Sequence, residues 1–120
     1  MHEAGLMASV LEIIDESRRG NNLRRVSAIT LQVGELNGAL PDALQFAFDA
    51  LRPEHPWLDP ACVLEIEAVE ARLQCLDCRY QGPGDSMICP VCQSGLTRLV
   101  QGEEFEILGY DGEPDEAGGY

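Results

Sequence analysis

The sequence predicts an α+β fold, with a small three-stranded sheet, two helices on one face of that sheet, and an inserted cysteine-rich module. Two segments show helical apolar periodicity, and three show the alternation that is typical of strands. The cysteines cluster between the second and third strand-like segments. Because a sheet covered by both helices buries these patterns with short connections, we expect this arrangement.

The first helix is expected over residues 4–19, where apolar side chains recur at three- and four-residue steps. This apolar stripe consists of Leu6, Met7, Val10, Leu11, Ile13 and Ile14. Glu3 precedes the first turn, where a carboxylate complements the helix dipole, and Gly20 ends the element.

The first strand is expected over residues 24–33, with Ile29, Leu31 and Val33 on its buried face. A connection rich in glycine and asparagine then leads to Pro41, whose fixed φ suits the first position of the second helix. The buried stripe of that helix consists of Leu44, Ala47, Phe48 and Leu51.

The remaining segments complete the sheet. Three prolines make residues 53–60 a stiff surface loop. Alternation over residues 62–70 indicates the second strand, with Leu64, Ile66 and Ala68 inward, and the third strand lies within residues 103–110. The predicted domains are an α+β domain of residues 1–72 and 101–110, a metal-binding module of residues 73–100, and an acidic, disordered tail of residues 111–120.

The charge balance argues against one large class of partner. The chain has 8 Lys and Arg residues against 21 Asp and Glu residues, and its formal net charge is −13. No nucleic acid partner is expected, because phosphate contacts need clustered basic side chains. No segment approaches the ~20 apolar residues of a membrane span, and the first residues do not resemble a secretory signal. We therefore expect no membrane partner and a cytoplasmic location, where the five cysteines stay reduced.

The cysteine-rich segment carries the pattern of a metal site. Two C-x-x-C pairs are formed by Cys75, Cys78, Cys89 and Cys92. Each pair can place two thiolates on one ion, which gives a closed tetrahedral S4 site of the structural type. Few apolar side chains lie in this segment, so metal binding should supply most of its folding energy. The sequence therefore predicts a zinc-ribbon-like module.

Zinc is the default ion, and a single iron in a rubredoxin-like S4 site is the alternative. In rubredoxin-like sites each C-x-x-C turn, or knuckle, is followed by glycine, but here Arg79 and Gln93 occupy these positions. The module also lacks the aromatic cluster of an electron carrier, so zinc is favoured. A reactive dithiol fits less well, because four cysteines at ligand spacing rarely stay free. The fifth cysteine, Cys62, lies on a predicted strand and is expected in the core.

The first three residues, MHE, offer a second set of ligands. An α-amine, a peptide nitrogen and an imidazole follow one another in Met1 and His2, and nitrogen-rich planar sets suit Ni(II) or Cu(II). By itself, the pattern is more typical of an exposed terminal histidine without a ligand. Glu3 suits two roles, as a partner of the helix dipole or as a neighbour of a metal.

The MHE start, combined with C-x-x-C and C-P-x-C after a strand, resembles the HypA/HybF family of hydrogenase maturation nickel metallochaperones. The stretches VGELNG and PDALQFAF are similar to the family as well, and the resemblance extends over most of the chain. Some members carry an acidic residue near the start of the second helix. The corresponding position here is Leu40, with Asp42 two residues later.

The resemblance implies two metal sites. Nickel would be bound by Met1, His2 and Glu3, through the His2 imidazole, the terminal amine and the backbone nitrogens of His2 and Glu3. Zinc would be bound by Cys75, Cys78, Cys89 and Cys92. The implied partners are a nickel-handling GTPase and the hydrogenase large subunit, and in some organisms a homologue also serves urease.

The predicted function is therefore delivery of Ni(II) for maturation of nickel–iron hydrogenase, with a structural or regulatory zinc site. The alternative is a zinc-ribbon protein–protein adaptor with no nickel role. An enzyme is not expected, because the sequence has no catalytic triad, phosphate-binding loop or H-E-x-x-H helix. His55, between Pro53 and Pro56, is expected as an exposed loop residue rather than a ligand.

Overall fold

The computed structural model describes residues 2–114, and in it the chain forms two compact units. The first unit comprises the described residues within Met1–Leu31, Ala39–Ile66 and Ile107–Tyr120. The second comprises Gln32–Gly38 and Glu67–Glu106. Neither helix in the described residues has the length and apolar character that crossing a membrane requires.

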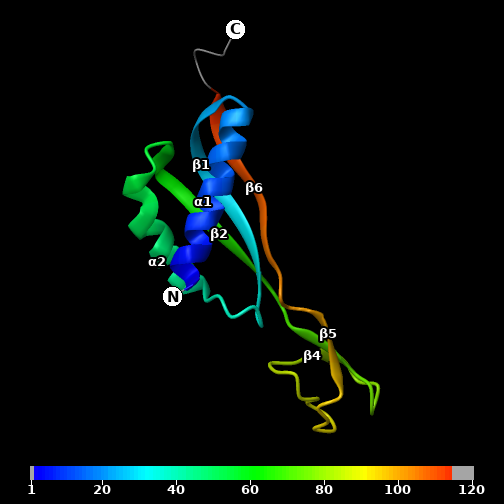
Figure 1. Cartoon of the computed structure of the whole chain (residues 1–120). Helices are drawn as coiled ribbons and strands as arrows, with labels where there is room; N and C mark the ends of the chain where they lie inside the picture. The colour runs from blue at the N-terminus through cyan, green and yellow to red at the C-terminus, as the bar shows by residue number, and fades with distance from the viewer. Residues whose placement is uncertain (1, 115–120) are drawn as a thin grey trace. The chain divides into compact units, whose positions relative to one another are not determined.

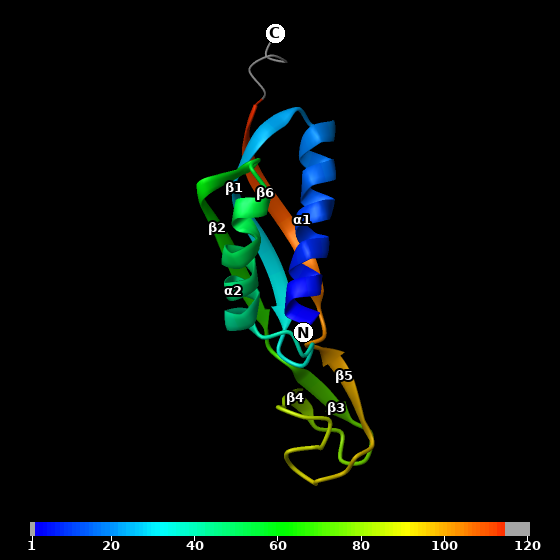
Figure 2. The same cartoon turned by 60° about the vertical axis from the view of Figure 1, so that its left-hand side comes forward.

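The first unit contains both helices and most of a three-stranded mixed sheet with strand order β2-β1-β6. Its elements are α1 (His2–Gly20), β1 (Leu23–Gly34), α2 (Pro41–Leu51), a short 3-10 helix (Arg52–Glu54), β2 (Leu58–Val69) and β6 (Phe105–Pro114). Figures 1 and 2 show α1 and α2 side by side on the same face of this sheet. The predicted fold class is thus confirmed.

Backbone hydrogen bonds set the strand directions. The N–H of Val26 donates to Trp57 O at 2.9 Å beside the start of β2, and the N–H of Glu35 donates to Val69 O at 2.9 Å at its end. The strands β1 and β2 are therefore parallel. The N–H of Gly34 donates to Glu104 O at 2.8 Å, just before β6 begins, so β1 and β6 are antiparallel.

The core of the first unit consists mainly of aliphatic side chains, with Phe48 and Trp57 as its buried aromatic residues. Ile29 and Leu31 of β1 are fully buried, and so is Leu44 of α2. Along α1 the buried residues are Met7, Val10, Leu11 and Ile14. The sequence placed Ile13 in this stripe, but its side chain is 59% exposed. A helix turns about 100° per residue, so Ile13 points away from the face that Ile14 buries.

Several element boundaries differ from the prediction. The helix α1 begins at His2 rather than at residue 4, and β2 begins at Leu58, inside the predicted proline loop. Pro60 is tolerated there because β2 is an edge strand. Ala68, predicted to point inward, is exposed.

The predicted tail also begins too early. Strand β6 continues to Pro114, so residues 111–114 are part of the sheet, and the rest of the predicted tail lies outside the described residues. These residues continue β6, which is paired with β1, and Ser27 Oγ on β1 also donates to Asp111 O at 3.4 Å. Pairing with β1 thus outweighs the acidic, glycine-rich composition of these residues.

The second unit contains a small antiparallel sheet with strand order β4-β3-β5. Its strands are β3 (Arg72–Cys75), β4 (Gln81–Pro83) and β5 (Thr97–Gln101). Leu73 is 1% exposed and Cys75 is 1% exposed, so one face of the central strand is buried. This sheet ends at the first cysteine pair, which it therefore positions.

Candidate metal centre

Four cysteine sulfurs converge in the second unit. The Sγ atoms of Cys75, Cys78, Cys89 and Cys92 all lie within 4.8 Å of one another. The Cys75–Cys92 and Cys78–Cys89 sulfur pairs are each 3.6 Å apart. A tetrahedron with Zn–S bonds of about 2.3 Å has edges of about 3.8 Å, so the arrangement fits one tetrahedral ion. Among the described residues, these four cysteines form the single cluster of possible metal-binding side chains.

The two C-x-x-C pairs form matching turns around these sulfurs. In the first turn, the N–H groups of Asp77 and Cys78 donate to Cys75 Sγ, both at 3.4 Å. In the second, the N–H groups of Val91 and Cys92 donate to Cys89 Sγ at 3.4 and 3.5 Å. Donors of this kind stabilise negative charge on sulfur, which is the form that binds a metal.

The residue after each pair adopts a left-handed backbone. Arg79 has φ of 68° and Gln93 has φ of 67°, which is the conformation that glycine adopts most easily. Each turn closes through a backbone bond, from Arg79 N to Cys75 O at 3.1 Å and from Gln93 N to Cys89 O at 3.0 Å. Both knuckles therefore form without glycine, so its absence from the sequence does not discriminate zinc from iron.

The thiols do not ionise equally. Desolvation raises the pKa of Cys89, but the N–H donors of Cys92 and Val91 outweigh it and lower this pKa to about 7. The N–H of Ser94 lowers the pKa of Cys92, but burial and the neighbouring thiols outweigh this donor and raise it to about 12. Metal binding must therefore displace protons from this cluster, and its affinity should rise with pH.

Cys62 lies apart from this centre. It sits on β2 in the first unit, its residue is 3% exposed, and it is absent from the sulfur cluster. Desolvation by burial raises the pKa of its thiol. The prediction that Cys62 belongs to the core is confirmed.

Two of the predicted nickel-binding residues, His2 and Glu3, lie in the first turn of α1. Met1 is outside the described residues, while His2 is exposed and is the first residue of the helix. The Leu40 N–H donates to Glu3 Oε2 at 3.2 Å and thereby lowers the pKa of the Glu3 carboxyl. The Glu3 side chain thus connects the first turn of α1 to the residue that precedes α2. No sequence pattern indicated this contact, because it joins residues 37 positions apart.

His55 occupies a different environment from the predicted one. It is half-buried rather than exposed, and its ring meets Trp57 edge-on at a centroid distance of 5.5 Å. It belongs to no metal-ligand cluster among the described residues. Packing against the tryptophan, rather than metal binding, explains its position.

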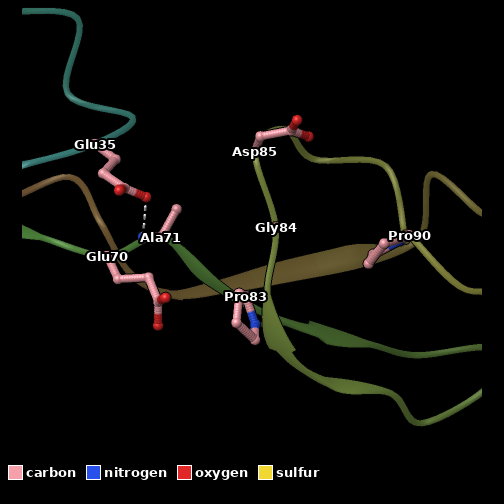
Figure 3. A pocket seen from close by; sticks show the side chains of 7 residues that line it. All are labelled: Glu35, Glu70, Ala71, Pro83, Gly84, Asp85 and Pro90. Carbon is pink, nitrogen blue, oxygen red and sulfur yellow. Dashed lines mark hydrogen bonds between the residues drawn. The ribbon is translucent and has the colours of Figure 1, made fainter.

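A cavity of about 340 Å³ lies in the second unit, lined by Glu35, Glu70, Ala71, Pro83, Gly84, Asp85 and Pro90 (Figure 3). Its carboxylates serve other contacts. Glu35 Oε1 accepts the N–H of Ala71 at 2.9 Å, and Glu70 Oε1 lies 2.9 Å from Arg72 Nη1. These acidic side chains do not converge on one point and form no candidate metal cluster.

Residues 1–111 match the family model described as HypA, hydrogenase/urease nickel incorporation, metallochaperone. A hydrogenase maturation factor HypA of Moorella thermoacetica is 35% identical over 94% of this chain and 100% of its own length. One of Geobacter metallireducens is 38% identical over 89% of this chain and 94% of its own length.

Solved structures support the fold independently. The solution structure of the Ni metallochaperone HypA from Helicobacter pylori matches with a TM-score of 0.64 at 21% identity, over 95% of this chain and 99% of that one. A second solution structure, that of a HypA protein, matches with a TM-score of 0.66 at 22% identity, over 97% of this chain and 98% of that one. At these identities the likeness supports the fold alone.

Proposed function

The chain belongs to the HypA family of nickel incorporation metallochaperones, and from this premise we propose that it has two metal sites. The N-terminus binds Ni(II), and the four-cysteine cluster binds Zn(II). Its function is that of a nickel metallochaperone in hydrogenase maturation rather than that of an enzyme. The nickel ion is its cargo.

Nickel is bound by the nitrogens of the first three residues. The ligands are the terminal amine of Met1, the His2 imidazole, and the backbone nitrogens of His2 and Glu3. The supporting observation is that α1 begins at His2, because the first four N–H groups of a helix have no carbonyl acceptor within it. Deprotonating these amides therefore breaks no bond of the helical ladder.

The charge of this complex suits a helix N-terminus. The positive end of the helix dipole disfavours a bare cation. Two deprotonated amides carry two negative charges, and they balance the charge of Ni(II) when the amine and imidazole bind as neutral ligands. A planar set of four nitrogens is a geometry that Ni(II) prefers. The exposed position of His2 leaves the ion accessible for transfer.

Zinc holds the module of residues 73–100 together. The four sulfurs have the spacing of a tetrahedral site, and all coordination positions are filled by protein, as in structural zinc sites. Zinc is proposed over iron because the module lacks the aromatic cluster of an electron carrier. The ion would then supply folding energy rather than chemistry.

The proposed partners are a nickel-handling GTPase and the hydrogenase large subunit, and the proposed location is the cytoplasm. All five cysteines are free of disulfide bonds, which suits a reducing compartment. In such a pathway the carrier receives Ni(II), and the recipient takes it by offering a better ligand set.

The test is a Ni(II) titration of the zinc-loaded, untagged protein beside its His2→Ala variant. His55→Ala is the matched control, because His2 and His55 are the two histidines of the chain. Removing a residue that only hydrogen-bonds to a metal ligand typically lowers metal affinity by about 10- to 100-fold. His2→Ala removes a ligand itself, so its nickel affinity should fall by at least this factor. His55→Ala should bind as the parent does. Equal nickel affinity of the His2→Ala and parent proteins would refute the proposed site.

A further inference from the structure

One face of the second unit's sheet carries a mixture of arginine, glutamine and exposed leucine side chains. Neighbours in the register are Gln74↔Gln81 and Gln74↔Arg98, and side chains directly opposite each other in antiparallel strands share a face. Leu73 and Cys75, on the other face, are buried. Gln74 therefore marks the outward face of the sheet.

Two leucines extend this face beyond the last strand pair. The Leu76 N–H donates to Leu96 O at 2.8 Å, which continues the β3–β5 register by one step past Cys75↔Thr97. Leu76 and Leu96 thus stand side by side on the same face as Gln74. Their exposed fractions are 63% and 59%, so both side chains are available for contact with a partner.

A hollow lies beside Leu76. A cavity of about 340 Å³ is lined by Gln74, Cys75, Leu76, Arg79 and Gln81. We name the outward residues Gln74, Leu76, Arg79, Gln81, Leu96 and Arg98 the arginine face. It combines apolar contact area with hydrogen-bond donors, as binding sites for polar ligands do.

Among the described residues, the two arginines of this face have no carboxylate partner. Six of the eight arginines form ion pairs, with partners Asp15, Asp49, Asp59, Glu70 and Glu113. Arg79 and Arg98 form none with any described residue, although the chain has 21 acidic residues. Arg98 donates to the neutral Gln74 Oε1, and the nearby Asp77 carboxylate accepts the Ser94 hydroxyl.

The first C-x-x-C turn holds Arg79 beside this cavity. The φ of 68° at Arg79 is the conformation that closes this turn, as the φ of 67° at Gln93 closes the second one. Arg79 is exposed and lines the cavity, so the turn places a charged residue that has no carboxylate partner among the described residues beside the hollow.

We propose that the arginine face is a docking surface for a leucine-bearing acidic segment of a partner protein. Arg79 and Arg98 would receive its carboxylates in charge-assisted hydrogen bonds, and Leu76 and Leu96 would contact its apolar side chains. The charge of the face favours an acidic partner, because its two charged residues, Arg79 and Arg98, are both positive on a protein of net charge −13.

Two other occupants fit less well. A second copy bound face to face would place arginines against arginines. The chain's own residues 115–120 include acidic side chains but no Leu, Ile, Val, Met or Phe to cover the leucines. A partner segment with both acidic and apolar side chains can pair with the arginines and also cover the leucines.

The experiment measures binding of two labelled decapeptides to the zinc-loaded, full-length protein by fluorescence anisotropy. One peptide consists of Asp, Glu and Leu with glycine ends, and its twin has every carboxylate replaced by an amide. The acidic peptide should bind more tightly, against the net charge of the protein, and added salt should weaken it. If the twin binds equally well, or if salt strengthens binding of the acidic peptide, the proposal is wrong.

Three variants locate the site. Arg79→Gly and Arg98→Gln should each weaken the acidic peptide by about tenfold, the usual worth of a charge-assisted hydrogen bond. Arg79→Gly also suits the left-handed backbone, so a folding defect does not explain its loss. Arg19→Gln removes the same charge from an exposed arginine of α1 and should leave binding unchanged. Equal losses in all three variants would overturn the proposal.

Two further measurements test the rejected occupants. Concentration-dependent dimerisation that Leu76→Ser abolishes would assign the face to a second copy. A gain in peptide affinity on deleting residues 115–120 would assign it to the chain's own tail. Either result would overturn the proposal, and a monomer with unchanged affinity after the deletion supports it.

Discussion

Glycine at the left-handed position of the second knuckle should strengthen zinc binding. Gln93 has φ of 67°, and its side chain makes no hydrogen bond to any described residue. Its backbone N–H closes the turn by donating to Cys89 O at 3.0 Å, and glycine keeps this donor. The Gln93→Gly substitution therefore changes the backbone preference and little else.

The magnitude follows from two opposing costs. A side-chain-bearing residue in the left-handed region costs about 1–2 kcal/mol, which glycine relieves. Glycine also makes the unfolded chain more flexible, at a cost of about 0.4–1 kcal/mol. The net gain is about 0.5–1 kcal/mol, or about two- to fivefold in an equilibrium constant. Because folding of the module is coupled to metal binding, this gain should appear in the zinc affinity.

The assay is zinc competition against a chromophoric chelator, with Gln93→Ala as the control. Alanine removes the same side chain but keeps the Cβ atom that makes the left-handed region costly. The glycine variant should hold zinc about two- to fivefold more tightly than the parent, and the alanine variant should not. If the two variants hold zinc equally, the strain argument for both knuckles is wrong.

Two predictions concern other parts of the chain. Gly34→Ala should lower the free energy of unfolding in urea by about 3 kcal/mol, because the added Cβ would lie 2.1 Å from Gly102 C and O. Gly5→Ala on α1 is the control: its added Cβ would have nothing within 4 Å, and it should raise the free energy of unfolding by about 1 kcal/mol. Equal effects would contradict the close approach. Burial raises the pKa of Cys62 above its ordinary 9.0, so the folded state keeps this thiol protonated after the unfolded state ionises. Stability should fall above pH 9.0 more steeply for the parent than for Cys62→Ala, and identical slopes would show that the thiol is not desolvated.

Local patterns were sufficient for most elements of the fold. The alternation around Ile29 and Leu31 and the stripe of Leu44 and Phe48 both predicted the faces that the structure buries. These signals depend only on the period of a strand or a helix. Ile13 shows the limit, because a stripe of six apolar residues on α1 is wider than the face the sheet can cover.

In the candidate sites, too, features set by local sequence were predicted, whereas others were not. C-x-x-C spacing predicted that four sulfurs would converge, because each pair fixes its own turn. The left-handed backbone at Arg79 was not predicted, since the residue type argues against it. The bond from Leu40 N–H to Glu3 was not predictable either, because it depends on how two helices come together.

The cysteine pattern predicts the metal ligands, but it does not predict the bounds of the folding unit that surrounds them. Residues 35–37, from the connection after β1, belong to the second unit and bond to the residues just before β3 and just after β5. Leu36 N–H donates to Gly102 O at 2.7 Å, and Asn37 Nδ2 donates to Glu103 O at 3.0 Å. Glu35 bonds through its N–H to Val69 and through its carboxylate to Ala71. A peptide of residues 73–100 would lack all of these contacts, so the energy of metal binding must act on a unit that includes this connection.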